Sequence, residues 1–303
     1  MLDHFAFAFG ITGPILLLLA LGWSARTIKL VDGHFVAQAN ALVFNIALPA
    51  MLFFALSTKS FDQTMDIRLT LVGLGGTLAL IGLLLIVGKL LPQEQRGVFV
   101  QGSYRGNLAI LGLALAVATY GDDALAIVAL YLAVVTTVYN IVAVWVLNSN
   151  GVLKQLLKNP ILIGITAGVI ASLIELPVPS LLANTSDYLA GMALPLALIC
   201  IGATLDFSSM RRHGKSISLA VFFKLIASPL LLVGLGILFN VNNEQLGILF
   251  FMAASPTATA SYIMARQMST QGALAAEIVA VTTVLGVLTN TAGIALLSTY
   301  SLI

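Results

Sequence analysis

The sequence predicts an all-α integral membrane protein in which about ten transmembrane helices form two inverted five-helix repeats. Its 303 residues are 59% hydrophobic and only 9% charged, with a mean hydropathy of +1.05. Soluble domains carry roughly 25% charged residues, so most of this chain has no water-facing surface to cover. A repeat with a spacing close to half the chain predicts the division into two halves.

Two short sequence motifs each occur twice, and both pairs have the same spacing of 146 residues. Ala-Leu-Pro occurs at 47–49 and 193–195 (193 − 47 = 146), and Val-Thr-Thr-Val at 135–138 and 281–284 (281 − 135 = 146). The same spacing carries Asn107 to position 253, within one turn of Ser255, Pro256 and Thr257. Asn107 and Pro256 interrupt two otherwise apolar segments. Matched interruptions in the two halves of a membrane chain indicate a secondary transporter.

Ten apolar segments approach the ~20 residues that a transmembrane helix needs. They lie near 5–23, 36–57, 68–90, 97–119, 124–147, 160–175, 183–205, 216–239, 246–268 and 273–297. The sixth is short and begins at Pro160, a residue type favoured in the first turn of a helix. The segment 148–158 is the candidate hinge, so the sequence predicts one repeat over 1–150 and the other over 151–303.

Lysine and arginine predict the orientation of these helices. The first segment is followed by basic residues, which places the N-terminus outside. The inner loops then hold ten basic residues: Arg26, Lys29, Lys89, Arg96, Lys154, Lys158, Arg211, Arg212, Lys215 and Arg266. The outer loops hold two, Lys59 and Arg68. Five helices per half is an odd number, so the second half enters the bilayer upside down and the C-terminus also lies outside.

The composition also argues against several classes of protein. Short loops and the lack of a eukaryotic targeting feature favour a bacterial inner membrane. The chain has no basic helix or aromatic-basic surface for nucleic acid. The single cysteine, Cys200, lies in an apolar segment and all three histidines lie in predicted loops, so neither a metal site nor a cofactor is expected. The spans contain no paired aspartates and no activated Ser/His pair, so the chain is not expected to be an enzyme.

Helices 4 and 9 carry the candidate substrate site at their interruptions. Proline removes a backbone donor and clashes with the preceding turn, so helix 9 is expected to kink or unwind at Pro256. If both helices break and cross at the midplane, half-helix N-termini with free N–H groups bind anions there. The candidate substrate-binding residues are Tyr104, Arg105, Asn107, Ser255, Pro256 and Thr257. The alternative is an ordinary proline kink with hydroxyls bonded back to carbonyls.

Arg105 is the most unusual of these residues. Its guanidinium cannot lose its charge, and a central arginine costs at least ~2.5–3.5 kcal/mol by insertion scales. Two roles stay open: a bidentate clamp on a substrate carboxylate, or a structural ion pair with a carboxylate. At ~100° per residue, Arg105 and Asn107 lie on different faces of an intact helix, so the clamp requires the helix to unwind between them.

Four other polar residues within the spans are secondary candidates. Lys224 is expected to snorkel back to the cytoplasmic interface. Glu277 is expected either to complement the N-terminus of helix 10 or to couple protons. Asn140 and Asn290 are expected to bond neighbouring helices at ~0.6–2 kcal/mol each, although their late positions in equivalent helices also suit the crossing.

Helices 2 and 7 carry matched prolines, Pro49 and Pro195, which are expected to bend these helices rather than to contact substrate. Helix 2 also contains Asn40 and Asn45. Both are expected to be buried amides that bond neighbouring helices.

These motifs resemble the auxin efflux carrier family, which contains plant PIN-type carriers and bacterial permeases. The resemblance rests on Arg105-Gly106-Asn107 followed by Leu-Gly-Leu at 111–113, and on Ala-Ser-Pro-Thr-Ala at 254–258. The segments 45–49 and 193–195 add to it, and it covers the whole length. Family members often carry a proline a few residues after the asparagine, where this chain has Ala114. Helix 4 is therefore expected to rely on Gly106 and Gly112 for its break.

The resemblance implies movement of small organic anions, such as mono- or dicarboxylates, by an elevator-like shift. It implies that helices 1, 2, 6 and 7 form a scaffold and homodimer surface, and that helices 3–5 and 8–10 form a transport domain in which broken helices 4 and 9 cross. Asn107 matches the family's substrate-contacting asparagine, and Pro256 the crossover proline.

Two further functions stay open. A sodium-coupled organic anion symporter resembling bile-acid symporters binds Na⁺ through oxygen ligands, and Asn107, Ser255, Thr257 and Thr259 supply them here together with freed carbonyls. The absence of a central Asp or Glu counts against it. A membrane sensor or receptor uses a carrier-like site without transport. An ion channel is disfavoured because no filter-like repeat appears.

Overall fold

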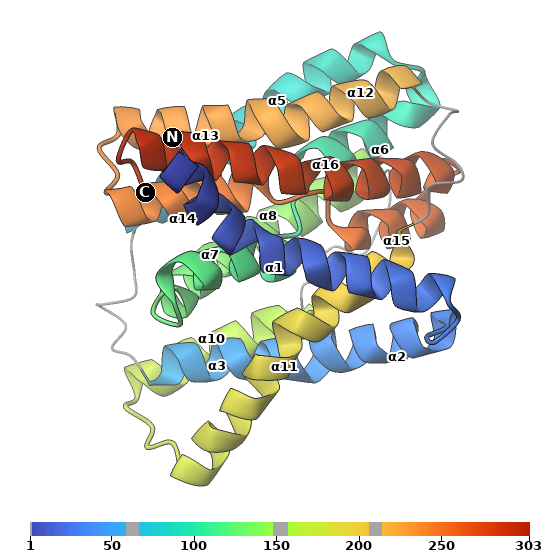
Figure 1. Cartoon of the computed structure of the whole chain (residues 1–303). Coiled ribbons are helices and arrows are strands. Elements are labelled where there is room, and N and C mark those ends of the chain that lie inside the picture. The colour runs from blue at the N-terminus through green and yellow to red at the C-terminus, as the bar shows by residue number, and fades with distance from the viewer. Residues whose placement is uncertain (1, 59–66, 148–156, 206–213) are drawn as a thin grey trace.

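The computed structural model of the protein describes residues 2–58, 67–147, 157–205 and 214–303 and is built from helices (Figure 1). No strand occurs within these ranges, and one isolated antiparallel bridge joins Gly106 to Thr257. Seven helices in the described ranges are long and apolar enough to cross a membrane: Asp3–Thr27, Gly33–Ser57, Ile67–Leu90, Ala124–Val146, Ser180–Thr204, Gly214–Leu238 and Gly272–Thr299. The chain is therefore a multi-pass membrane protein.

The first half follows the predicted order of spans. Its helices are α1 (Leu2–Thr27), α2 (Gly33–Leu42), α3 (Leu48–Ser57), α5 (Ile67–Val87), α6 (Gln93–Tyr104), α7 (Leu113–Tyr120) and α8 (Ala124–Val146). A π-helical turn, Val43–Ala47, joins α2 to α3 within one span, and a second, Leu108–Gly112, precedes α7. The fourth predicted span is therefore present as two pieces, α6 and Leu108–Tyr120.

The second half has the same plan. Its helices are α10 (Pro160–Leu173), α11 (Ser180–Thr204), α12 (Gly214–Phe222), α13 (Ser228–Leu238), α14 (Asn243–Ala254), α15 (Thr259–Met268) and α16 (Gly272–Thr299). The ninth predicted span is again in two pieces, α14 and α15. The spacing between matching helix starts is 147 for α2 and α11 (180 − 33), 150 for α6 and α14 (243 − 93) and 148 for α8 and α16 (272 − 124).

Prolines account for two of the three π-helical turns in the described ranges. The turns Val43–Ala47 and Phe223–Ala227 each lie just before a proline, Pro49 or Pro229. Proline has no N–H and its ring clashes with the preceding turn, and a wider π-helical turn absorbs that clash without ending the helix. Pro160 begins α10 as predicted, whereas Pro195 lies inside the continuous α11.

The helices form two groups (Figure 1). In the lower part of that view α2, α3, α10 and α11 lie together, and α10 packs against α3. The other group contains α5 to α8 and α12 to α16. The long α1 runs between the groups and packs against both α11 and α16. Two cavities, described below, lie at the interface between the two groups.

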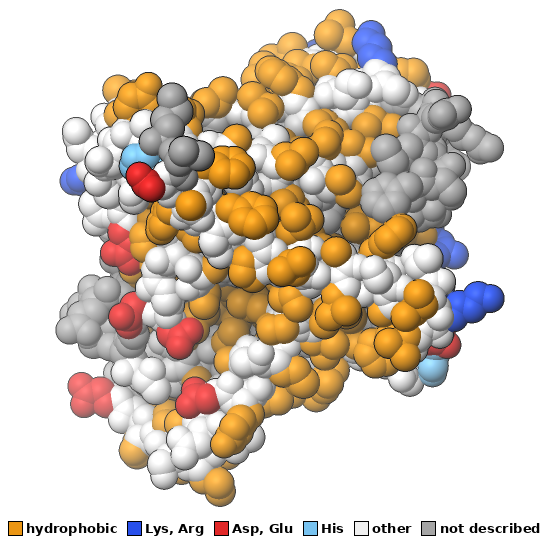
Figure 2. Space-filling view, in the orientation of Figure 1, with side chains coloured by type: hydrophobic (Ala, Val, Ile, Leu, Met, Phe, Trp, Pro, Cys, Tyr) orange, Lys and Arg blue, Asp and Glu red, His pale blue; other side chains and the backbone are white. Residues whose placement is uncertain are grey.

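Charged side chains separate along the direction of the helices. On the face shown in Figure 2, most of the Asp and Glu side chains lie at the end where Figure 1 marks the two termini, and most of the Lys and Arg side chains lie at the opposite end. Four basic residues used to predict the orientation, Lys59, Lys154, Arg211 and Arg212, and most of the expected hinge at 148–158 lie outside the described residues. The orientation in the membrane stays a prediction.

Candidate functional site

Both predicted interruptions are present in the structure. The first helix ends at Tyr104, and the backbone leaves the helical region at Arg105 (φ −77°, ψ 90°) and Asn107 (φ −80°, ψ 65°). The second ends at Ala254, and the chain is extended at Ser255 (φ −58°, ψ 130°) until α15 begins. The first break contains no proline. It occurs at Gly106, in agreement with the expectation drawn from Ala114.

The two interruptions pair with each other like a short piece of β-sheet. The Asn107 N–H donates to the Pro256 carbonyl at 2.7 Å, and the Ala258 N–H donates to the Arg105 carbonyl at 2.9 Å. Between these bonds, Gly106 faces Ser255 and Lys224. A Cβ on Gly106 would overlap the Ser255 Oγ and lie 3.0 Å from the Lys224 Nζ. The two backbone segments approach so closely here because Gly106 has no side chain.

Side-chain donors bond to carbonyls at the ends of both half-helices. The Thr257 hydroxyl donates to the Gly102 carbonyl at the end of α6 (2.6 Å). At the end of α14, the carbonyls of Met252, Ala253 and Ala254 receive bonds in turn from the Ser255 hydroxyl (2.8 Å), the Lys224 ammonium (2.9 Å) and the Asn290 amide (3.4 Å). Ser255 and Thr257 therefore bond back to carbonyls, as the kink interpretation expected, while the chain also unwinds.

The amide ends of the half-helices are arranged differently. Neither Asn107, which precedes the turn Leu108–Gly112, nor Ala258, which precedes α15, caps its helix with a side chain. Asn107 is only 5% exposed, yet its Nδ2 has no hydrogen-bond partner within the described residues. The Ser261 Oγ, in the first turn of α15, is also buried without a partner there. Each amide end thus has an unsatisfied buried polar atom beside it.

Arg105 and Tyr104 both bond to α8. The Arg105 guanidinium donates through Nη1 to the Tyr139 carbonyl (3.2 Å) and through Nη2 to the Asn140 Oδ1 (2.8 Å). The Tyr104 hydroxyl donates to the same Tyr139 carbonyl (3.1 Å). The expected structural partner of Arg105 was a carboxylate, but the partners found in the described chain are neutral oxygens. Asn140 lies at the first interruption and Asn290 at the second, so both amides are at the crossing.

Two predictions about polar residues, Lys224 and Asn45, are wrong, and one of the two alternatives for Glu277 is excluded. Lys224 does not snorkel: it is fully buried, because the π-helical turn that contains it faces the end of α14. Glu277 lies beyond the first turn of α16 and is buried, so it does not complement the N-terminus of that helix. Asn45 is exposed and its amide bonds to the Ala41 carbonyl of its own helix. Asn40 is half-buried and lines a cavity.

The cavity that contains Asn40 has a volume of about 590 Å³ and lies between the two helix groups. Residues of α2 and α11 form one wall, and residues of α15 and α16 form the other. Its polar lining includes Thr259, the first residue of α15, and Tyr262. A neighbouring cavity shares Tyr262 and contains Arg266, whose guanidinium donates to the Tyr262 hydroxyl (3.3 Å). The amide end of α15 therefore borders an open cavity.

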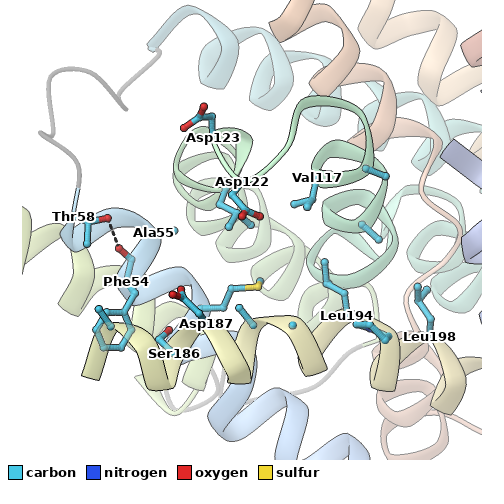
Figure 3. A pocket seen from close by; sticks show the side chains of 18 of the residues that line it. Phe54, Ala55, Thr58, Val117, Asp122, Asp123, Ser186, Asp187, Leu194 and Leu198 are labelled. Atoms are coloured by element: carbon cyan, nitrogen blue, oxygen red, sulfur yellow. Dashed lines mark hydrogen bonds between the residues drawn. The ribbon is translucent and has the colours of Figure 1, made fainter. Parts of the chain in front are cut away.

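A second cavity of about 610 Å³ lies between the groups near the termini (Figure 3). Residues of α1, α3 and α11 line it together with α7, the half-helix that follows the first interruption. Asp122 and Asp187 project into it from opposite walls (Figure 3). Each half-helix that begins at the crossing is thus bordered by its own cavity, and the two cavities lie toward opposite ends of the molecule.

Sequence reasoning missed the residues that lie at the crossing without standing out in the sequence. Ser261 is an ordinary hydroxyl of an amphipathic segment, and the only signal for it was its position three residues after the break. The carbonyl of Tyr139, which accepts from both Tyr104 and Arg105, carries no sequence signal. Asp122 and Asp187, which line the second cavity, were not among the candidate residues.

Comparisons with known proteins agree with this architecture. The model of a family described as "Membrane transport protein" matches residues 10–151 and 144–294. A protein of Rhizobium meliloti strain 1021 named "Putative malonate transporter" is 27% identical over 93% of this chain and 93% of its own. The uncharacterized transporter YfdV of Escherichia coli strain K12 is 25% identical over 83% of this chain and 85% of its own. An uncharacterized transporter of Methanothermobacter thermautotrophicus is 22% identical, with the same two coverages.

Proposed function

The chain belongs to the auxin efflux carrier family of membrane transport proteins, and we propose that it is a secondary carrier of small organic anions with its substrate site at the crossing of the two interrupted helices. Mono- and dicarboxylates are the proposed substrate class. Malonate is the first probe to use, because a relative that matches 93% of the chain carries a malonate transporter name.

One observation carries the proposal: side chains donate to carbonyls at the ends of α6 and α14, whereas the amide ends at the crossing have no side-chain cap. Helix N-termini hold partial positive charge and free N–H groups, which bind anions. The buried Nδ2 of Asn107 is a further donor without a partner at the first of these ends. A carboxylate oxygen placed there accepts from both the backbone and the Asn107 amide. The same atoms offer nothing to a neutral apolar solute.

The two cavities support an alternating-access mechanism. Both lie between the helix group of α2, α3, α10 and α11 and the group that holds the crossing. We propose that the first group, with α1, is a scaffold and that the other moves against it in an elevator-like shift. On this view the halves are inverted repeats, the scaffold forms a homodimer surface, and the termini lie outside a bacterial inner membrane.

The test is a thermal-shift titration of the detergent-purified protein with a panel of carboxylates. A ligand at 100 times its dissociation constant stabilises a protein by ~2.7 kcal/mol. We expect malonate or a related acid to raise the melting temperature of the wild type and of Asn45→Ala, and to leave that of Asn107→Ala unchanged. Asn45→Ala is the matched control because that amide is exposed and bonds only within its own helix.

Uptake into liposomes separates a carrier from a sensor with a carrier-like site. A carrier accumulates labelled acid inside the vesicles, with a rate that saturates at low concentration. A sensor gives the thermal shift without uptake. If no carboxylate shifts the wild type, with or without sodium, the organic-anion proposal is rejected.

A further inference from the structure

Lys224 is the buried cation that the proposed mechanism has not yet used. It lies in the π-helical turn Phe223–Ala227 between α12 and α13, five residues before Pro229. Its side chain is fully buried at membrane depth. A buried ammonium in a membrane is costly unless a cavity or a partner receives it, so its surroundings indicate its role.

The ammonium touches both interrupted segments. The Lys224 Nζ donates to the Ala253 carbonyl at 2.9 Å, in the last turn of α14. It also lies 3.0 Å from the position that a Cβ on Gly106 would occupy. Gly106 is followed by Asn107, the residue that precedes the helical turn Leu108–Gly112. Lys224 therefore lies between the carbonyl end of one half-helix and the amide end of the other.

The electrostatic role of the ammonium follows from these two neighbours. The carbonyl end of a helix holds partial negative charge and is stabilised by a cation. A carrier that lacks a fixed cation there can fill the position with a metal ion held by freed carbonyls and hydroxyls. Here the position is already taken, because Lys224 and the Ser228 hydroxyl (3.4 Å) both donate to the Ala253 carbonyl.

A positive charge remains after that bond is made. A carbonyl is neutral, and it takes one of the three ammonium donors. Within the described chain, the hydrogen-bond acceptor of Lys224 is this carbonyl alone. The same holds for the charge of Arg105, whose acceptors are a backbone carbonyl and an amide. When Lys224 is protonated, the crossing thus holds two positive charges, those of Lys224 and Arg105, on the side where Asn107 precedes its helix.

We propose that Lys224 is the fixed counter-charge of the transported anion and takes the place of a co-transported sodium ion. This inference rests on the proposed function and decides between its two forms, the sodium-independent carrier and the sodium-coupled symporter. Lys224 neutralises the partial negative charge at the carbonyl end of α14. Without this lysine, a sodium ion would have to neutralise that charge. It also adds positive charge beside the Asn107 end, where the anion binds.

The experiment measures malonate uptake by the full-length protein in liposomes. Wild-type rates are compared in NaCl, KCl and choline chloride at equal ionic strength, with the membrane potential clamped. We expect the three rates to agree within about twofold. A loss of more than about tenfold without sodium overturns the inference and favours the symporter. This comparison needs no variant, so it stands even if substitutions at Lys224 do not fold.

Variants then test the charge itself. Lys224→Met keeps an unbranched apolar stem and is expected to raise the KM for malonate by at least about tenfold, whereas Lys224→Arg keeps most of the affinity. Ser216→Ala is the control, because Ser216 lies in the neighbouring helix α12 and its hydroxyl bonds to Gln95 and not to the crossing, and its KM should stay within about twofold. A folded Lys224→Met with an unchanged KM overturns the inference. If the wild type neither takes up nor binds any carboxylate, the proposed function fails, and this inference fails with it.

Discussion

Replacing Gly106 with alanine tests whether the two interruptions pack as tightly as the structure indicates. The new methyl group would overlap the Ser255 Oγ and lie 3.0 Å from the Lys224 Nζ and 3.2 Å from the Leu108 Cδ2. Ser255 is fully buried, and its hydroxyl is held to the Met252 carbonyl at 2.8 Å. The methyl group must therefore displace that hydroxyl or separate the paired backbones.

The size of the effect follows from these two costs. Overpacking of a well-packed site costs ~1–3 kcal/mol, and loss of a buried hydrogen bond adds ~1 kcal/mol. Together they predict a loss of about 2–4 kcal/mol. At ~2–4 °C per kcal/mol for larger chains, the melting temperature should fall by about 4–16 °C. The assay is thermal unfolding of the detergent-purified protein.

Two further variants make the prediction sharp. Gly75→Ala in α5 is the matched control, because no atom lies within 4 Å of the position of its Cβ, and it should not lower the melting temperature. Ser255→Ala removes the atom that the new methyl group overlaps. The double variant should therefore be more stable than the sum of the single effects by ~1–2 kcal/mol. A melting temperature for Gly106→Ala that matches Gly75→Ala within ~2 °C, or strict additivity with Ser255→Ala, would refute the reasoning.

Three other predictions concern groups around the crossing and at one helix start. Arg105→Lys should lower stability in thermal unfolding by ~1–3 kcal/mol, because one ammonium cannot make both bonds of the planar guanidinium, and the loss should be non-additive with Asn140→Ala. Thr257→Val removes the bond to the α6 carbonyl end and should cost ~1–2 kcal/mol in stability, whereas Thr259→Val, at the cavity wall, should weaken malonate binding with stability changed by no more than ~0.5 kcal/mol. At the start of α2, the Asp32 carboxylate accepts a hydrogen bond from the Phe35 backbone N–H at 2.8 Å, and this bond holds the pKa of the Asp32 carboxyl below its ordinary value. Its stabilisation is therefore complete above the unfolded-state pKa and is lost as the pH falls through the folded-state pKa, and Asp32→Asn should remove that part of the pH dependence of the melting temperature.

Local signals in the sequence predicted the helices and their breaks. Hydropathy sums over a whole segment, so the ends of spans such as 124–147 and 160–175 fall within two residues of α8 and α10. Pro256 acts through its own missing N–H, and Gly106 through its missing side chain, so both breaks follow from the identity of single residues. The spacing of 146 residues came from two repeated motifs, and the starts of the helix pairs α2/α11, α6/α14 and α8/α16 repeat at 147 to 150. Small differences in loop length separate these values.

The partners of the polar side chains could not be predicted from the sequence, because they depend on contacts between distant segments. The side chain of Lys224 is long enough to reach either the cytoplasmic interface or the protein core. The π-helical turn before Pro229 and the carbonyl end of α14 together direct it into the core. Arg105 is surrounded by carbonyl and amide oxygens of α8, and an acceptor of that kind cannot be told from a carboxylate without the packing of the two helices. The two cavities arise between helix groups, so no single segment encodes them.

The distribution of hydrogen-bond partners at the crossing argues for an anion rather than a cation as the transported species. The carbonyls of Gly102, Met252, Ala253 and Ala254 each receive a side-chain donor, which makes them less available to a cation. The free oxygens in this region are side-chain amide oxygens, the buried Asn290 Oδ1 and Gln101 Oε1, which have no partner within the described residues. An anion site needs free donors, and the amide ends lack side-chain caps while the Asn107 Nδ2 is buried without a partner in the described chain. Because a buried donor without an acceptor costs ~1–3 kcal/mol, the empty crossing is less stable than it would be with an acceptor in place. Under the proposed function, a carboxylate that accepts from the Asn107 Nδ2 would remove that cost, and part of its binding free energy would come from the satisfaction of this protein atom.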